Sequence, residues 1–366
     1  NVTLTSGGSA AVATIGSYSI SASAATGSGL ANYNIGYSNG VMTVGAASLV
    51  VKANDTNKVY GATLAPVDYT VTGLANSDTV TNVSLSSAGG VSNAPAGLHP
   101  IFISAATGTG LTNYNIGYSN GVLTVGAANL LITALDTNKV YGTTVVPVAY
   151  AVSGLLNSDT VTNVMLSSTG IPTNAAAGPH PIIPSVASGT GLTNYSIIYS
   201  NGVLSVSTAN LLITASDTNK TYGSTLDPSD FTTTGLLNGD SVTNLTFTSS
   251  GSPVGVPIGN YPITPSAAAG PGLANYNIAY SNGTLGVTAA LLTVTANDSN
   301  KVYGATRTFA GNEFGITGGS LFNGDTLTNA ALVSSGAAAG ALGAQLVNIA
   351  ASTSGTVLTS AYIAWP

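Results

Sequence analysis

The sequence predicts an all-β protein made of tandem copies of one small β-domain, and two features of the chain lead to this prediction. The first is a repeat, because a Tyr-Gly pair returns every 81 residues. The second is composition, since only 5% of the 366 residues are charged while 44% are hydrophobic. Ordinary globular proteins carry roughly 25% charged residues, and disordered chains lack so many apolar ones. Each copy is therefore expected to fold around a packed core.

The repeat sets the expected domain boundaries, because self-similarity at a fixed period marks tandem structural units. The Tyr-Gly pairs are Tyr60-Gly61, Tyr141-Gly142, Tyr222-Gly223 and Tyr303-Gly304. Complete copies are expected over 48–128, 129–209 and 210–290, with partial copies over 1–47 and 291–366. The first copy starts in mid-repeat, so we expect the chain to be a window of a longer polypeptide. The last copy carries an insertion, and residues 345–366 depart from the pattern.

Alternating apolar residues predict the strands of each copy. Leu49, Val51 and Ala53 alternate along the segment, and position 52 between them is Lys or Thr in this copy and the three later ones, which is the period of a strand with one buried face. The same positions are apolar in the three later copies. Val83 and Leu85 alternate likewise and predict a second strand.

An Asn-Gly pair predicts a hairpin near the end of each copy. Asn-Gly favours a type I′ turn, in which both central residues have positive φ. With Asn39-Gly40 as the turn, Tyr37 would face Met42 and Ile35 would face Val44. The pair returns as Asn120-Gly121, Asn201-Gly202 and Asn282-Gly283.

Prolines mark another strand of each copy as an expected edge strand. Pro100, Pro181 and Pro262 follow directly on His99, His180 and Tyr261, and Pro184 and Pro265 come three residues later. Proline cannot donate to the ladder of a central strand. An edge strand of this kind would also discourage pairing between neighbouring molecules.

Six or seven short strands in 81 residues favour a small immunoglobulin-like β-sandwich. A β-grasp-like fold is the alternative if Gly73–Asp78 forms a helical turn. The connections between copies, such as Gly45–Ala47, are short and restrict rotation. The tandem array is therefore expected to form a fairly stiff, elongated rod.

Three recurring segments carry a resemblance to a known family: the Asp-x-Asn-Lys-x-Tyr-Gly opening, the Gly-Leu-x-Asn-Ser/Gly-Asp middle and the Asn-Tyr-x-Ile…Asn-Gly close. Together they resemble MBG-type repeats of the Tyr-Gly class, which occur in tandem in large bacterial surface proteins similar to filamentous haemagglutinins. The resemblance covers nearly the whole chain. It implies an extracellular structural or adhesive role, and it supplies no catalytic residues.

Composition excludes several classes of function. The net charge is −6, with no basic cluster that could release counterions from a nucleic acid or attract an anionic membrane. There is no cysteine, which removes disulfides and thiolate metal sites. No stretch reaches the roughly 18 apolar residues of a membrane helix, so no membrane insertion is expected.

No catalytic or cofactor-binding residue is predicted, and the chain is not expected to be an enzyme. His99 and His180 are the only histidines, at a position where other copies carry Tyr18 and Tyr261. A position that accepts tyrosine or histidine indicates space filling rather than acid–base chemistry. No carboxylate recurs where it could orient a histidine toward a serine.

The Asp-x-Asn-Lys segment allows three interpretations. Asp55 or Asn57 could bond nearby amides in an Asx turn. Alternatively, these oxygens could bind Ca²⁺ together with a loop acid such as Asp78. In the third, Lys58 forms an isopeptide crosslink. The calcium candidates over all copies are Asp55, Asn57, Asp78, Asp136, Asn138, Asp159, Asp217, Asn219 and Asp240.

Recurring tyrosines such as Tyr33, Tyr37, Tyr114 and Tyr118 could stack on sugars, but their alternation with isoleucine favours core packing. The expected partners are neighbouring repeats of the same chain, and the alternatives are identical chains in a filament or a cell-surface glycan or protein. The expected function is therefore the stalk or spacer of an adhesin. The alternatives are a subunit of a self-assembling filament or sheath and, less favoured, a glycan-binding module.

Overall fold

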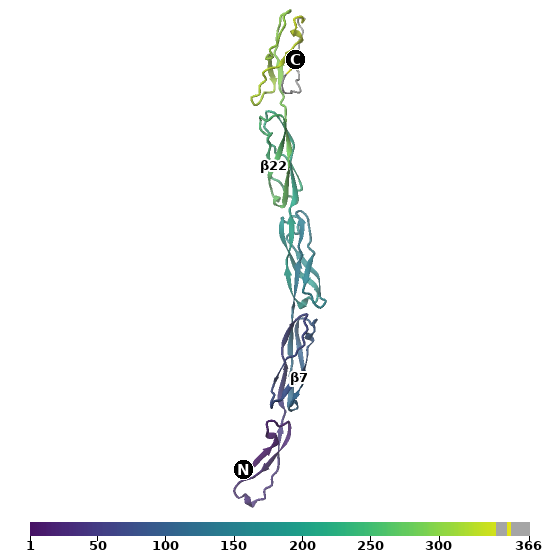
Figure 1. The fold of residues 1–366 in the computed structure, drawn as a ribbon, viewed down its shortest axis with the longest axis vertical. Helices are drawn as coiled ribbons and strands as arrows, with labels where there is room; N and C mark the ends of the chain where they lie inside the picture. Colours follow the sequence, from purple (N-terminus) through teal and green to yellow (C-terminus); the bar gives the residue numbers. More distant parts are fainter. Residues whose placement is uncertain (342–349, 353–366) are drawn as a thin grey trace. The chain divides into compact units, whose positions relative to one another are not determined.

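The computed structural model describes residues 1–341 and 350–352, which form short β-strands and three-residue 3₁₀ turns (Figure 1). This described part contains no α-helix, and no helix in it is long and apolar enough to cross a bilayer. The all-β prediction is confirmed.

The described residues group into two compact units. Unit 1 contains residues 1–137, 146–171 and 179–204, and unit 2 contains 138–145, 172–178 and the chain from 205 onward. The division passes through copy 129–209, three short segments of which group with the copy that follows.

The strands return at the same positions in successive copies. Copy 1–47 contains β1 (Thr3–Ser6), η1 (Gly7–Ser9), β2 (Gly16–Ser23), η2 (Leu30–Asn32) and β3 (Gly40–Val44). Copy 48–128 contains β4 (Ala47–Ala53), β5 (Thr56–Val59), β6 (Tyr69–Thr72), β7 (Thr79–Ser86), η3 (Ala88–Gly90), β8 (Gly97–Thr109), η4 (Leu111–Asn113), β9 (Tyr114–Ser119) and β10 (Gly121–Gly126). Copy 129–209 contains β11 (Ala128–Ala134), β12 (Thr137–Val140), β13 (Tyr150–Ser153), β14 (Thr160–Ser167), β15 (Gly178–Thr190), η5 (Leu192–Asn194), β16 (Tyr195–Ser200) and β17 (Gly202–Ser207).

Copy 210–290 contains β18 (Ala209–Ala215), β19 (Thr218–Thr221), β20 (Phe231–Thr234), β21 (Asn244–Thr248), β22 (Gly259–Ala269), η6 (Leu273–Asn275), β23 (Tyr276–Ser281) and β24 (Gly283–Thr288). Copy 291–366 contains β25 (Thr293–Ala296), β26 (Phe314–Gly318), β27 (Ala331–Val333), η7 (Ser335–Ala337) and β28 (Ala350–Ser352). Apart from β28, the divergent segment 345–366 lies outside the described residues.

Each complete copy in a single unit is a sandwich of two sheets. In copy 48–128, a three-stranded sheet has the order β6-β4-β9 and a four-stranded sheet has the order β5-β10-β8-β7. Copy 210–290 repeats both sheets as β20-β18-β23 and β19-β24-β22-β21. Residues 73–78 form a turn without a helix. The structure therefore matches the sandwich and not the β-grasp alternative.

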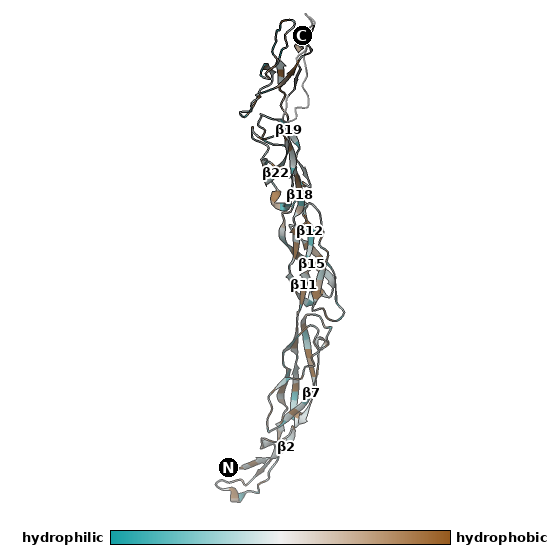
Figure 2. Ribbon diagram, turned by 45° about the horizontal axis from the view of Figure 1, so that its top comes forward, coloured by the Kyte–Doolittle hydropathy of each residue, from teal (hydrophilic) through white to brown (hydrophobic). Residues whose placement is uncertain are grey.

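The core lies between the two sheets. Leu49, Val51 and Ala53 of β4 are buried together with Ile101 of β8 and Leu123 of β10. Figure 2 shows hydrophobic residues, in brown, along strands such as β11 and β15. The predicted alternation of the first strand is confirmed, since its apolar side chains are among the most deeply buried.

The predicted Asn-Gly hairpin is wrong. Strand β9 pairs with β4, whereas β10 pairs with β5 and β8, so the chain changes sheets at Asn120-Gly121. Neither residue has positive φ. Gly121 is required for a different reason: a Cβ there would lie 2.6 Å from the Ala53 carbonyl oxygen. In copy 1–47, residues 33–39 do not form a strand.

The turn with two positive φ angles lies elsewhere in the copy. Asn157 and Ser158 have φ of 51° and 66°, and the equivalent pair Asn238-Gly239 has 54° and 80°. Asparagine and glycine tolerate this region better than other residues, which explains Asn157, Asn238 and Gly239 at these positions.

The predicted edge strand is also wrong, because β8 pairs with β10 on one side and β7 on the other. The two pairings are staggered: Gly97–Ile101 of β8 pairs with β10, and the pairing of β8 with β7 starts only at Phe102. Pro100 therefore lies in a half of the strand that β7 does not reach. The strand is internal to the sheet, yet each half has one free side that can accept proline.

Consecutive copies are joined by almost no linker. Strand β10 ends at Gly126 and β11 begins at Ala128. The predicted short connection is present at this boundary, where a single residue separates the two strands.

Candidate functional site

The Asp-x-Asn-Lys-Val-Tyr-Gly segment occupies β5 and the residues that flank it. Asp55 does not form the expected local turn: its Oδ1 accepts the backbone N–H of Val122, 67 residues away, at 2.8 Å. The equivalents Asp136 and Asp217 accept from Val203 and Thr284, each at 2.7 Å. The carboxylate therefore continues the pairing of β5 with β10.

Lys58 is buried, and its ammonium group binds the loops beside it. Its Nζ donates to the carbonyl oxygens of Ala62 at 2.7 Å and Val91 at 2.5 Å. Burial lowers the pKa of Lys58. An isopeptide crosslink would join Lys58 to an Asn or Asp side chain, whereas its ammonium group here donates to two backbone carbonyls. Lys58 instead holds the Tyr-Gly loop against the loop around Val91.

The Tyr-Gly pair forms the contact with the next copy. The hydroxyl of Tyr60 donates to Oδ2 of Asp159 at 2.8 Å, and the hydroxyl of Tyr195 donates to the same oxygen at 2.8 Å. The rings of Tyr60 and Tyr195 meet edge to face with centroids 5.4 Å apart. One carboxylate of copy 129–209 thus binds a tyrosine from each of two copies.

Two asparagine side chains of copy 129–209 bind backbone groups of the preceding copy at the same joint. Asn157 donates from Nδ2 to the carbonyl of Ser92 at 2.9 Å, and Asn194 accepts from the N–H of Ala96 at 3.0 Å. Asn157 has a positive φ and lies in the same turn as Asp159, two residues before it. Copy 48–128 therefore contributes peptide groups to the joint, and copy 129–209 contributes the side-chain amides that bind them.

Gly61 allows the close approach of the two copies. Its φ is +90°, and a Cβ at this position would lie 2.5 Å from Cδ1 of Leu156. Glycine alone meets both conditions, since other residues rarely adopt this φ. The leucine of the Gly-Leu-x-Asn segment thus packs directly on the glycine of the Tyr-Gly pair.

The same joint recurs in unit 2. Tyr141 and Tyr276 both donate to Oδ2 of Asp240 at 2.8 Å, and their ring centroids are 5.5 Å apart. Tyr222 donates to Oδ2 of Asp325 at 2.8 Å, where Phe322 replaces the leucine of the other joints. The recurring segments of the sequence are therefore the two halves of one joint.

Burial raises the pKa of two joint tyrosines, Tyr195 and Tyr276. Burial raises the pKa of Tyr195 to about 12, and its hydrogen bond to Asp159 acts in the same direction. Burial also raises the pKa of Tyr276 to about 12, beside Asp240. These two phenols therefore stay neutral when they donate to the carboxylates.

The calcium candidates occupy different settings. Asp55, Asp136 and Asp217 accept from strand amides, whereas Asp78, Asp159 and Asp240 accept from tyrosine hydroxyls. Asn57, Asn138 and Asn219 lie on β5, β12 and β19. Among the described residues, no group of three or more His, Cys, Asp or Glu side chains could hold a metal ion. Calcium binding stays a prediction, to be checked by whether millimolar Ca²⁺ raises the melting temperature.

The two histidines pack beside glycine turns. His99 Nε2 lies 2.9 Å from the carbonyl oxygen of Pro95, and His180 Nδ1 lies 3.1 Å from Oγ1 of Thr169. A Cβ on Gly89 would lie 2.8 Å from His99. The ring at this position therefore covers the glycine of the adjacent 3₁₀ turn.

The core-packing prediction fails for some tyrosines and not others. Tyr33, Tyr37 and Tyr118 are 74%, 47% and 43% exposed, whereas Tyr114 packs against the core. The hydroxyl of Tyr118 accepts the N–H of Ala106 at 2.9 Å. This tyrosine reaches out of the core because it satisfies an amide beside a bulge in β8.

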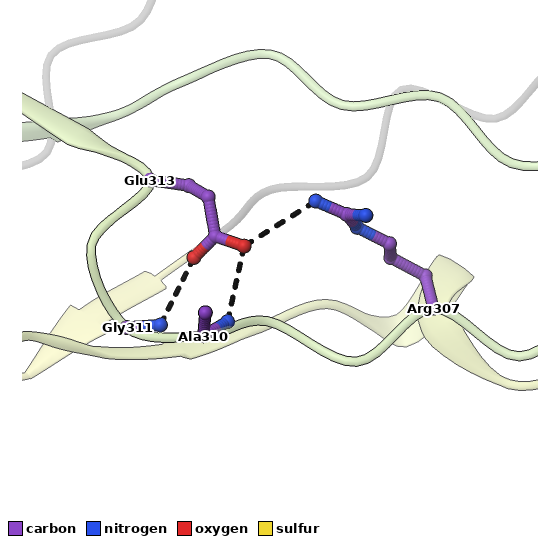
Figure 3. Close-up of polar contacts among 4 residues, drawn as sticks. All are labelled: Arg307, Ala310, Gly311 and Glu313. Carbon is purple, nitrogen blue, oxygen red and sulfur yellow. Dashed lines mark hydrogen bonds and ion pairs between the residues drawn. The ribbon is translucent and has the colours of Figure 1, made fainter.

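The inserted loop of the last copy contains a separate polar cluster (Figure 3). Glu313 accepts from the N–H groups of Ala310 at 3.0 Å and Gly311 at 2.9 Å, and it pairs with Arg307 at 3.3 Å. The backbone bond from Ala310 contributes most to lowering the pKa of Glu313. The cluster therefore closes its own loop.

The joint was not predicted from the sequence, although a signal for it existed. Tyr60 and Asp159 lie 99 residues apart in different copies, and sequence reasoning treated each copy separately. Tyrosine, glycine, leucine, asparagine and aspartate nevertheless recur in phase at positions that no strand alternation explains.

Comparison with known proteins agrees with the repeat. A family model of the MBG domain (YGX type) matches residues 49–124, 130–205 and 211–286. No curated protein matches the chain.

Among solved structures, the chain is similar to Drosophila N-cadherin EC1-4 (7% identity, 75% of this chain and 83% of that one, TM-score 0.28). It is also similar to the I9–I11 tandem of titin, with 14% identity, coverage of 67% of this chain and 100% of that one, and a TM-score of 0.20. A third similarity is to Bacteroides ovatus SGBP-B in complex with a mixed-linkage heptasaccharide, with 14% identity, coverage of 66% of this chain and 68% of that one, and a TM-score of 0.13. These scores are too low to support a functional assignment.

Proposed function

Because the chain belongs to the MBG domain family of the YGX type, we propose that it is the stalk or spacer of an adhesin in a large extracellular bacterial surface protein. It is a structural repeat module whose copies bind one another through recurring joints. The observation that carries the proposal is the carboxylate shared by Tyr60 and Tyr195 at the joint centred on Asp159. A joint of this kind fixes successive domains, which is what a spacer requires.

The polar contacts of the recurring segments support the same role. The polar side chains of the described joints serve contacts between copies, and the lysine of the motif binds its own loops. The proposal includes no enzymatic activity and no cofactor. The purified chain is expected to show no hydrolase or transferase turnover.

Surface labelling tests the stalk. Antibodies raised against the purified chain should bind intact cells of the bacterium that produces it, and external protease should remove the signal. Antibodies against a cytoplasmic protein of the same cells serve as the control. Binding only after lysis would contradict an extracellular stalk.

The filament alternative gives a different result in solution. A self-assembling subunit should grow with concentration in light scattering, whereas a stalk segment should stay monomeric. A glycan-binding module should show saturable binding on a glycan array, which a spacer does not require.

A further inference from the structure

The first strands of a copy run parallel to its last strands. In copy 48–128, β4 is parallel to β9 from Ala47↔Tyr114 to Lys52↔Ser119, and β5 is parallel to β10 from Thr56↔Leu123 to Val59↔Gly126. Copy 210–290 repeats both pairings, with β18 beside β23 and β19 beside β24. The entry and exit of a copy are therefore held together by two parallel pairs, one in each sheet.

This arrangement determines how tension acts on a copy. In a parallel pair, the start of one strand and the end of the other lie at opposite ends of the ladder. Tension that enters at β4 and leaves at β10 pulls the paired strands lengthwise past each other. All hydrogen bonds of the pair are then loaded together, whereas peeling from one end would load them one at a time.

The recurring motif lengthens the second parallel pair at both ends. Asp55 accepts the N–H of Val122 before the first register pair, and the N–H of Tyr60 donates to Gly126 at 2.9 Å after the last one. In copy 210–290, Asp217 and Tyr222 form the same bonds with Thr284 and Thr288.

Further hydrogen bonds hold β19, the motif strand of copy 210–290. Oγ1 of Thr288 donates to the carbonyl of Lys220 at 3.1 Å, so the strand gains a bond outside its ladder. Lys220 in turn is buried and donates to Ser224 and Ser252, each at 3.0 Å. The strand is thus bonded both to its partner and to the loops beside it.

We propose that residues 55–60 and 217–222 are mechanical clamps that let their copies resist tension along the chain. The clamp is a property of the single copy and does not depend on where the protein resides. It adds a function to the motif beyond the joint, because Asp55 and Lys58 act within one copy while Tyr60 serves both.

Single-molecule force measurements on the full chain, pulled from its two ends, test the clamp. The three complete copies should unfold one at a time, each releasing about 290 Å of chain at up to about 3.6 Å per residue. The chain contains no cysteine, so handles can be attached to introduced ones. A second chain carrying Asn57→Cys and Thr124→Cys is pulled across this register pair, which loads β5 and β10 sideways. We expect it to open at less than half the force, and equal forces in the two directions would overturn the clamp.

Matched variants separate mechanical resistance from ordinary stability. Replacing Asp55 and Asp217 by alanine removes one bond of each clamp. Replacing Leu85 and Phe247 by alanine weakens packing on β7 and β21, which pair only antiparallel in the registers shown. For the same drop in melting temperature, the aspartate variant should lose more unfolding force. An equal loss in both variants would overturn the proposal, and absence of the protein from the cell surface would overturn the stalk alone.

Discussion

Asp159 joins two copies because a single carboxylate oxygen accepts two tyrosine hydroxyls. Tyr60 comes from the preceding copy and Tyr195 from its own, each at 2.8 Å. Hydrogen bonds to an ionised acceptor are shorter and stronger than neutral ones. The contribution of either tyrosine should therefore depend on Asp159.

A double-mutant cycle tests this dependence. Tyr60→Phe and Asp159→Ala should each lower the free energy of unfolding, and the double variant should lose about 0.5–3 kcal/mol less than the sum of the two. Urea denaturation of the full chain measures the three values. Tyr118→Phe is the control, because its hydroxyl bonds Ala106 within one copy. Its cycle with Asp159→Ala should be additive, and additivity for Tyr60 would contradict a shared carboxylate.

The joint also predicts a pH dependence. The folded-state pKa of Tyr195 is raised to about 12, above the ordinary value near 10. Its contribution to stability is therefore complete below pH 10 and is lost as the pH rises through 12. The melting temperature of the native chain should exceed that of Tyr195→Phe at pH 8–10, and the difference should close toward pH 12.

The buried lysines do not obscure this comparison. Burial lowers the pKa of Lys58 and Lys139, so their contribution to stability grows as the pH rises toward their ordinary value. This change is common to both chains and cancels in the difference. A gap that stays constant from pH 8 to 12 would show that Tyr195 ionises normally.

Among the strands, the sequence predicted what depends on alternation and missed what depends on pairing. Leu49, Val51 and Ala53 are buried as expected, because burial of one strand face requires only a period of two. The partner of β9 could not be predicted in this way. Asn120-Gly121 carries the residues of a type I′ turn, but the contact of Gly121 with Ala53 comes from a strand far away in sequence.

The same limit applies to the candidate site. Proline at position 100 correctly indicated a side of the strand without a partner, but the stagger of β7 and β10 along β8 is a property of the whole sheet. The carboxylates were recognised as recurring, yet their acceptor role depends on strand and copy neighbours that no local pattern specifies.

Strand β15 contains a strained position that gives a prediction at this scale. Val186 has φ of +45°, although β-branched residues almost never adopt positive φ, and the equivalent residues Ala105 and Ala267 have 51° and 52°. Val186 is 68% exposed, so little packing would be lost on its removal. Val186→Gly should raise the free energy of unfolding by about 1 kcal/mol, measured by urea denaturation.

An exposed valine in ordinary strand conformation provides the matched control. Val203 of β17 lacks a positive φ. Val203→Gly should lower the free energy of unfolding by about 0.5–1 kcal/mol, because glycine costs more entropy in a strand. If both substitutions destabilise the protein, the strain at Val186 is not relieved by glycine.

At the scale of the whole molecule, tandem copies with short connections and recurring joints are expected to form an elongated particle. A domain of this size is about 30 Å across, so the chain should exceed roughly 120 Å in length. Breaking the joints should leave the copies folded but free to turn relative to one another. Stiffness and folding can then be measured separately.

Small-angle X-ray scattering of the full chain measures this length. The native chain should give a maximum dimension above roughly 120 Å that does not change with concentration. A triple variant with alanine at Tyr60, Tyr141 and Tyr222 loses side chains that bridge copies. Its distance distribution should become broader and shorter, while its circular dichroism spectrum should stay unchanged. Tyr118→Ala, which removes an exposed tyrosine from within one copy, should leave the distribution intact. A compact particle would contradict the rod, and a length that grows with concentration would favour the filament over the stalk.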